Sequence, residues 1–88
     1  MGDISCIQMS GEDMKAEYKL YYRYLGQNIA LYRKYRSMTQ GTLAERIGID
    51  QSHLSRIENA STGVSMDLVF AIAETLQVPP EKLLQDKT

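Results

Sequence analysis

Two short amphipathic segments joined by a tight turn constrain the fold of this 88-residue chain more than any other feature. Residues 40–47 and 51–59 each have apolar side chains at helical spacing, and Gly48-Ile49-Asp50 joins them. Gly48 can adopt the positive φ that ends a helix, and Asp50 is a favourable N-cap for the next one. This pattern predicts a helix-turn-helix. The spacing alone leaves DNA binding open, because any small helical bundle contains such pairs.

The rest of the chain predicts further helices and no strand. Tyrosine, leucine and isoleucine recur at spacings of three and four within residues 12–36, which predicts one long amphipathic helix. Thr39 and Ser65 are the expected N-caps of the second and fourth helices. The fourth should cover residues 66–77, and Pro79-Pro80 should end it before a last short helix. We therefore expect an all-α domain of five helices.

Composition indicates one small domain with a tail at each end. The chain is 43% hydrophobic and 24% charged, and no apolar run is long enough to cross a bilayer. We expect a tail at 1–11, a helical extension at 12–24, the helix-turn-helix domain at 25–84 and a tail at 85–88. The first ten residues lack the basic start of a secretory signal, so a cytoplasmic location is expected.

Metal binding and catalysis are disfavoured by the residues available. Cys6 is the only cysteine and His53 the only histidine, so one chain cannot supply a tetrahedral zinc site. Cys6 is expected to be a spectator thiol in the tail. No nucleophile, base and orienting group occur together, and Glu45 and Glu74 are typical solvated helix charges. We expect no metal, no cofactor and no enzymatic activity.

The net charge of −1 hides a strong asymmetry along the chain. Residues 14–56 carry eight Lys and Arg against three Asp and Glu, a net +5, whereas 1–13 and 57–88 each carry a net −3. A basic centre between acidic ends suits a protein that offers one face to phosphates, although a solvated helix face would look similar.

Several motifs around the two central helices occur in a fixed order. They are Met38-Thr39-Gln40, residues 43–49 (LAERIGI) and 54–59 (LSRIEN), with 25–29 (LGQNI) and Tyr32-Arg33-Lys34 upstream and 72–78 (IAETLQV) and Leu83-Leu84 downstream. In order and spacing they resemble the phage repressor/Cro family of helix-turn-helix regulators over residues 25–84. The resemblance implies a five-helix, lambda-repressor-like domain that binds operator DNA as a dimer.

The helix predicted at 51–59 is the expected recognition helix, whose N-terminal residues would face base edges in the major groove. Gln51, Ser52, Ser55 and Arg56 share one face of it, opposite its apolar residues. Gln pairs bidentately with adenine and Arg with guanine, while Ser serves either base. The resemblance also assigns base reading to positions 51, 52 and 56. We expect Gln51 and Arg56, then Ser52 and Ser55, to read bases.

Other polar residues are candidates for phosphate contacts. The resemblance assigns a phosphate to Gln40, beside Thr39 at a helix N-terminus whose free N–H groups favour an anion. The loop after the recognition helix has no basic residue, so its contacts would come from the hydroxyls of Ser61 and Thr62 and from backbone N–H groups. His53 is expected at the groove edge, where it touches a phosphate or nothing.

Arg33 and Glu58 match a family arginine and glutamate that form a largely buried ion pair between the first and third helices. By this resemblance their role is structural: the pair would fix the recognition helix and read no DNA. Removing one partner of a buried pair strands a charge, at a cost of about 3–5 kcal/mol.

Three features depart from the family pattern. Gly41 and Thr42 weaken the first turn of their helix, the loop after the recognition helix is neutral, and the chain extends upstream of residue 25. The extension is rich in tyrosine, at positions 18, 21, 22 and 24. These rings could pad the core, form a dimer or partner surface, or accompany a DNA-contacting arm of Lys15, Lys19 and Arg23. Leu83 and Leu84 are the other dimer candidates.

These observations favour a transcription regulator, expected to be a repressor, that binds a palindromic double-stranded DNA operator as a homodimer. Two alternatives stay open. One is an antitoxin that represses its own operon and binds a toxin through the N-terminal extension. The other is a protein-interaction module that has kept the fold without strong DNA binding. A membrane partner is not expected.

Overall fold

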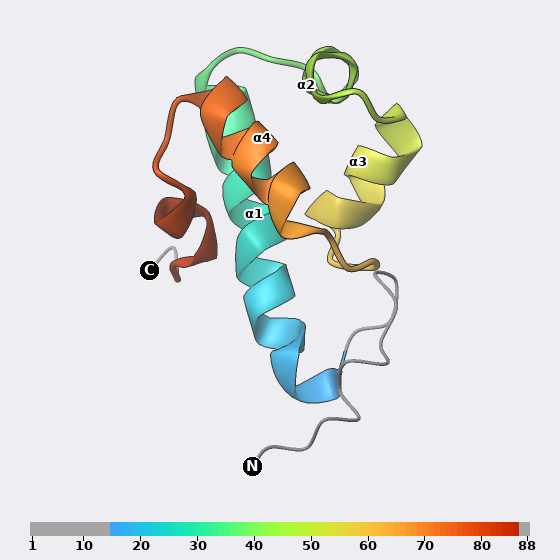
Figure 1. The fold of residues 1–88 in the computed structure, drawn as a ribbon, viewed down its shortest axis with the longest axis vertical. Helices are drawn as coiled ribbons and strands as arrows, with labels where there is room; N and C mark the ends of the chain where they lie inside the picture. Colours follow the sequence, from blue (N-terminus) through green and yellow to red (C-terminus); the bar gives the residue numbers. More distant parts are fainter. Residues whose placement is uncertain (1–14, 87–88) are drawn as a thin grey trace.

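A computed structural model describes residues 15–86 and contains four α-helices and two 3₁₀ helices in that range (Figure 1). In chain order they are η2 (Ala16–Tyr18), α1 (Lys19–Tyr35), α2 (Gln40–Ile47), α3 (Gln51–Glu58), α4 (Met66–Leu76) and η3 (Pro80–Leu84). The range holds no strand, which confirms the all-α prediction. The expected fifth α-helix is instead the 3₁₀ helix η3. The tail at 1–11 with Cys6, residues 12–14 of the expected extension, and residues 87–88 lie outside the described residues.

The core is one apolar cluster to which all four α-helices and η3 contribute. Its members are Leu25, Ile29, Leu43, Ala44, Leu54, Ile57, Val69, Ile72, Ala73, Leu76 and Leu83. None of the helices in residues 15–86 is both long and apolar enough to cross a membrane.

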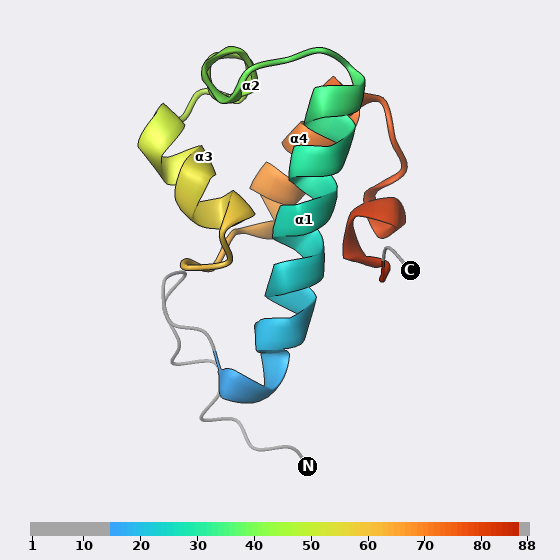
Figure 2. The same cartoon turned by 180° about the vertical axis from the view of Figure 1, so that it is seen from behind.

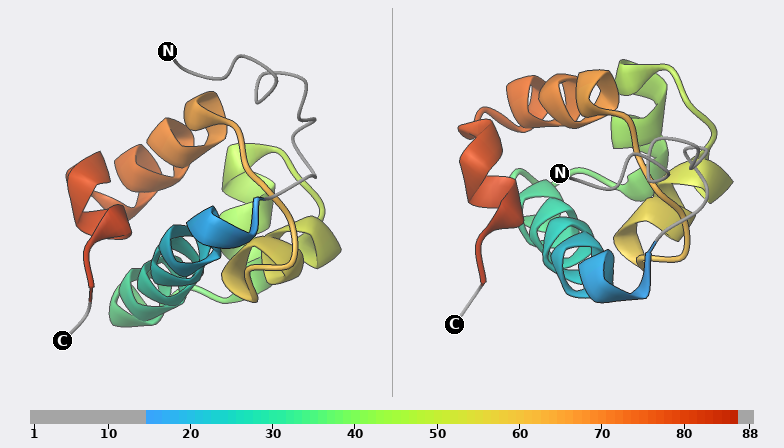
Figure 3. Two further views of the ribbon diagram at one scale, coloured as in Figure 1. Left: turned by 90° about the horizontal axis from the view of Figure 1, so that it is seen from below. Right: turned by 60° about the horizontal axis from the view of Figure 1, so that its bottom comes forward.

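The arrangement of the helices leaves α3 and η3 at opposite sides of the molecule. α1 and α4 lie between them in the views from front, back and below (Figures 1, 2 and 3). Asn28 on α1 holds η3 in place, because its buried Nδ2 donates to the carbonyl oxygens of Leu83 at 3.0 Å and Gln85 at 2.7 Å. The surface of α3 that faces away from the core is therefore remote from the C-terminal segment.

The helix ends follow the predicted chemistry with one exception. Thr39 and Ser65 cap α2 and α4, because their hydroxyl oxygens accept from the backbone N–H groups of Thr42 and Leu68. Gly48 ends α2 with φ of 80° in the left-handed region, as predicted. Asp50 occupies the predicted N-cap position of α3 in extended conformation, but its side chain accepts no capping hydrogen bond.

Several predicted boundaries were too long. The first α-helix begins at Lys19 after the short η2 turn, and α3 ends at Glu58 rather than at residue 59. α4 ends at Leu76 because Gln77 adopts a left-handed φ of 61° and terminates it. The segment of η2 and α1 that contacts the core is also shorter than predicted. Tyr18 and Tyr21 are 44% and 57% exposed, so core padding is the wrong interpretation for these two rings.

Gly26 sits where α1 crosses the C-terminal end of α3. A Cβ atom built on it would lie 2.6 Å from the carbonyl oxygen of Ile57 and still closer to that of Glu58. Real Cβ atoms do not approach backbone oxygens so closely, so the two helices meet at this separation only because residue 26 has no side chain. This contact determines how closely α3 packs against α1.

Candidate nucleic-acid interface

α3, the expected recognition helix, separates its apolar and polar residues onto two faces. Leu54 and Ile57 are 0% and 1% exposed and anchor the helix in the core. Gln51, Ser52 and Arg56 are exposed, and Ser55 is half-buried. The four residues predicted to read bases therefore come from the outward side of one helix, as its 3.6-residue period requires.

Gln51, the first residue of α3, lies beside the first turn of α2. Its Oε1 is 3.5 Å from the point that a Cβ atom on Gly41 would occupy. Gly41 therefore lies next to a candidate base-reading side chain, which a Cβ atom at this position would just touch. The departure from the family pattern at this position is thus part of the same surface.

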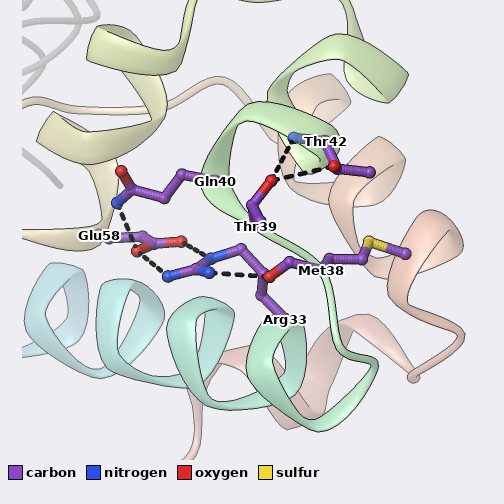
Figure 4. A network of polar contacts seen from close by, with 6 residues as sticks. All are labelled: Arg33, Met38, Thr39, Gln40, Thr42 and Glu58. Carbon is purple, nitrogen blue, oxygen red and sulfur yellow. Dashed lines mark hydrogen bonds and ion pairs between the residues drawn. The ribbon is translucent and has the colours of Figure 1, made fainter.

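Behind this surface, one carboxylate joins three helices (Figure 4). Glu58 on α3 accepts from Nε of Arg33 on α1 at 2.8 Å and from its Nη2 at 3.1 Å. It also accepts from Nε2 of Gln40 on α2 at 2.9 Å. The remaining guanidinium nitrogen, Nη1, donates to the carbonyl oxygen of Met38 at 2.9 Å. The structure thus brings together Arg33 and Glu58, which the sequence pairs by resemblance, and adds Gln40 to them.

This network is buried, so the loss of any one of its partners would leave a polar or charged group without compensation. The side chains of Arg33 and Glu58 are 10% and 6% exposed. Within residues 15–86, no buried side-chain nitrogen or oxygen lacks a hydrogen-bond partner. A bidentate arginine–carboxylate pair is the geometry that best offsets the desolvation of two charges. The amide of Gln40 has two hydrogens, and its bond to Glu58 uses one of them.

The two candidate phosphate-binding hydroxyls in the loop after α3 differ in exposure. Ser61 is exposed, and its Oγ donates to the carbonyl oxygen of Arg56 at 3.2 Å. Thr62 is 7% exposed, which leaves little of this side chain to meet a phosphate. His53 is half-buried and lines, with Arg56 and Thr62, an open cleft of about 400 Å³ beside the loop.

Two polar residues with structural roles were missed from the sequence. Asn28 fixes η3, as described above, and Arg36 closes the end of α4. Nε of Arg36 donates to the carbonyl oxygen of Leu76 at 2.9 Å, and its Nη2 donates to that of Gln77 at 3.3 Å. An arginine in such a place is a natural partner for the unpaired carbonyls at a helix C-terminus. The sequence carries no signal of which helix it would reach, because the contact spans about forty residues.

A metal centre finds no support in the part of the chain that the structure describes. No three His, Cys, Asp or Glu side chains gather there in a way that could hold an ion.

The fold and the surface of α3 define the chain as a small helix-turn-helix domain. A family model described as helix-turn-helix matches residues 29–83. The chain therefore belongs to this helix-turn-helix family, which confirms the resemblance to repressor/Cro-type regulators.

Similar proteins agree with this assignment. The HTH-type transcriptional regulator SinR of Bacillus subtilis is 36% identical over 64 residues, which cover 72% of this chain and 58% of SinR. The solved N-terminal DNA-binding domain of SinR superposes with a TM-score of 0.67 at 35% identity, covering 74% of this chain and 96% of that domain. Antitoxin PezA of Streptococcus pneumoniae is 37% identical over 54 residues, 61% of this chain and 34% of PezA. The chain thus matches little more than half of SinR and a third of PezA.

Proposed function

We propose that this chain is a sequence-specific regulator of transcription that binds double-stranded DNA and is not an enzyme. The observation that carries the proposal is the outward face of α3, where three polar side chains are exposed on a helix anchored by Leu54 and Ile57. Its relative SinR is named a transcriptional regulator, and the domain of SinR that this chain resembles is named a DNA-binding domain.

In this proposal α3 enters the major groove from its N-terminal end, while α2 crosses the phosphate backbone. Gln51 and Arg56 read bases by bidentate hydrogen bonds, and Ser52 and Ser55 supply single ones. The second amide hydrogen of Gln40 is directed to a phosphate, with the N-terminus of α2 at Thr39 beside it. His53, Ser61 and Thr62 complete the phosphate contacts, with Thr62 reaching DNA least because it is buried.

The regulator would act in the cytoplasm as a repressor, with two copies bound to a palindromic operator. The recognition helices of a symmetric dimer must then reach half-sites that lie about one helical turn, or roughly 34 Å, apart. Because the loop after α3 has no basic residue, few charged contacts are made there. We therefore expect a shallower dependence of affinity on salt than a basic loop would give.

Selection of binding sites from random duplex DNA tests the proposal. The wild type should enrich a palindrome, and Arg56→Ala should relax the preference at one base pair of each half-site by about 1–3 kcal/mol at fixed salt. Lys82→Ala is a matched control, because this exposed lysine lies in η3, across the molecule from α3. No enriched sequence, or equal effects of the two substitutions, would contradict base reading by α3.

The similarity to PezA favours one second candidate, an antitoxin that represses its own operon. Such a protein would bind both an operator and a toxin. Co-expression distinguishes it from a simple repressor: an antitoxin restores growth to cells that express the toxin, and a variant with Arg56→Ala should retain that protection. Failure to enrich any DNA, together with protection, would favour an interaction module.

A further inference from the structure

A patch of large apolar side chains lies exposed around the first turns of α1, the start of α4 and the end of η3. We call it the tyrosine patch and define it by Tyr18, Tyr21, Met66, Phe70 and Leu84, which are 43–57% exposed. Tyr21 and Tyr24 pack edge to face, with ring centroids 6.3 Å apart. All but Phe70 line an apolar cleft of about 220 Å³ whose wall also includes the buried Leu25 and Val69. Phe70 follows Met66 by one turn of α4.

The exposed apolar area of the patch is typical of a site that binds another macromolecule. A large side chain presents roughly 150–250 Å², so five that are half exposed offer about 400 Å² per molecule. Contiguous apolar patches of several hundred Å² mark interaction sites on soluble proteins, whereas isolated apolar residues do not. A standard protein interface buries about 800 Å² per partner. The patch supplies about half of that area, and a polar rim around it can supply the rest.

The charged residues around the patch identify the partner. Lys19 and Arg23 are exposed on α1, whereas Asp67 and Glu81 are exposed at the starts of α4 and η3. None of these four forms an ion pair within residues 15–86. Glu17 beside Tyr18 and Lys82 beside Glu81 are exposed as well. Counting these six residues, the edge along η2 and α1 carries a net charge of +1 and the edge along α4 and η3 a net charge of −1. In a two-fold symmetric contact, residue i of one copy meets residue j of the other and the reverse, so the basic edge of each copy faces the acidic edge of its partner.

From this self-complementarity we propose that the tyrosine patch is the homodimer interface of this protein. An aromatic side chain of one copy enters the cleft of the other, which is large enough because a cavity of about 150 Å³ holds a benzene ring. The carboxylates along the acidic edge disfavour DNA as the occupant. The inference rests on the proposed dimeric regulator and deepens it, because it assigns the N-terminal half of α1 to assembly and leaves α3 free for DNA.

Sedimentation equilibrium without DNA tests the interface. Tyr21→Glu places a charge in the patch and should weaken self-association at least tenfold. Tyr35→Glu is the matched control: it changes an exposed tyrosine of the same helix, 79% exposed and outside the patch, and should leave the dimer intact. Far-ultraviolet circular dichroism should show that both variants fold. A wild type that stays monomeric at high concentration, or equal dimerisation by Tyr21→Glu, would overturn the inference.

Charge reversal tests the orientation of the two copies. Lys19→Glu with Arg23→Glu makes both edges acidic and should weaken the dimer. Adding Asp67→Lys and Glu81→Lys exchanges the two edges and should restore most of the lost affinity. A quadruple variant that is no better than the double one would overturn the two-fold arrangement.

These experiments separate the interface from the proposed function. If the patch forms the dimer but no DNA sequence is enriched, the regulator proposal fails and the interface stands. If a palindrome is enriched and Tyr21→Glu binds it with unchanged cooperativity, the regulator proposal stands and the interface lies elsewhere.

Discussion

Gly26 of α1 and Glu58 of α3 meet backbone to backbone, with no space for a side chain between their helices. Gly26→Ala should therefore destabilise the protein by about 1–3 kcal/mol, because the added methyl group forces the helices apart and shifts the end of α3. This outcome opposes the usual gain from replacing a glycine inside a helix by alanine. Chemical denaturation measures the difference in the free energy of unfolding.

Gly41→Ala is the matched control for this prediction. Its Cβ would lie 3.5 Å from Oε1 of Gln51, an ordinary van der Waals contact. The variant should gain up to about 1 kcal/mol from helix propensity. Equal effects of the two alanines would show that the approach of α1 to α3 is not close.

Glu58→Ala should be one of the most damaging single substitutions in the protein. It strands the buried Arg33 and leaves Gln40 without its acceptor, at an expected cost of about 3–5 kcal/mol. Each kcal/mol corresponds to roughly 4–8 °C in melting temperature for a domain of this size. Thermal unfolding followed by circular dichroism should show the loss, while Glu45→Ala, at an exposed site on α2, should stay within about 0.5 kcal/mol of wild type.

If Glu58→Ala fails to fold, Glu58→Gln supplies the measurement. It keeps one acceptor for Arg33 but removes the charge, so its loss of stability should be intermediate. A melting temperature within about one degree of wild type for the glutamine or the alanine variant would contradict a structural role for the pair.

Gln77→Gly should stabilise the protein by about 0.5–1 kcal/mol. Gln77 ends α4 with a φ of 61°, a conformation that glycine adopts without steric cost. Its carbonyl oxygen, which accepts from Arg36, is unchanged by the substitution. Gln27→Gly makes the same replacement at an exposed position inside α1 and should cost about 1 kcal/mol. The two glycines should thus shift the denaturation midpoint in opposite directions.

Tyr24 should lose its proton at higher pH than a free tyrosine. Its pKa is raised above the ordinary value of 10.0, first by burial and then by the negative charge and hydrogen bond of Asp86, whose Oδ2 lies 3.4 Å from the phenol oxygen. Because the folded state favours the neutral phenol, this contribution to stability is present below pH 10 and is lost as the pH rises through the raised pKa.

The ultraviolet absorbance of phenolate reports this titration, as the difference between wild type and Tyr24→Phe. Asp86→Asn removes the charge, so the pKa of Tyr24 should move back toward the ordinary value. A titration that is the same with and without Asp86 would show that its carboxylate has no influence on Tyr24.

The sequence predicted well what depends on neighbours in the chain. The bounds of α2 and the left-handed Gly48 follow from local patterns of apolar residues and caps. What it missed depends on contacts between distant elements. By helix propensity alone, Gly26 would only cost its helix about 1 kcal/mol relative to alanine, whereas the structure shows that the close crossing of α1 and α3 requires it. Tyr18 and Tyr21 have core spacing, but α1 extends past the elements that could cover them. Gln77 was assigned to α4 because nothing local marks a non-glycine residue as left-handed.

The same distinction applies to the candidate site. The exposed face of α3 could be read from helical periodicity, because Leu54 and Ile57 fix which side is buried. The bond from Gln40 to Glu58 could not, because it joins residues 18 positions apart through side-chain geometry.

That single carboxylate has a thermodynamic consequence. Glu58 on α3 accepts hydrogen bonds from Arg33 on α1 and from Gln40 on α2. The two helices of the helix-turn-helix, α2 and α3, are therefore held in one arrangement before any ligand binds. Binding would then require little ordering of the backbone, so its heat-capacity change should reflect the contact surface alone, without a contribution from folding. The binding surface would therefore already have its final backbone conformation before DNA binds.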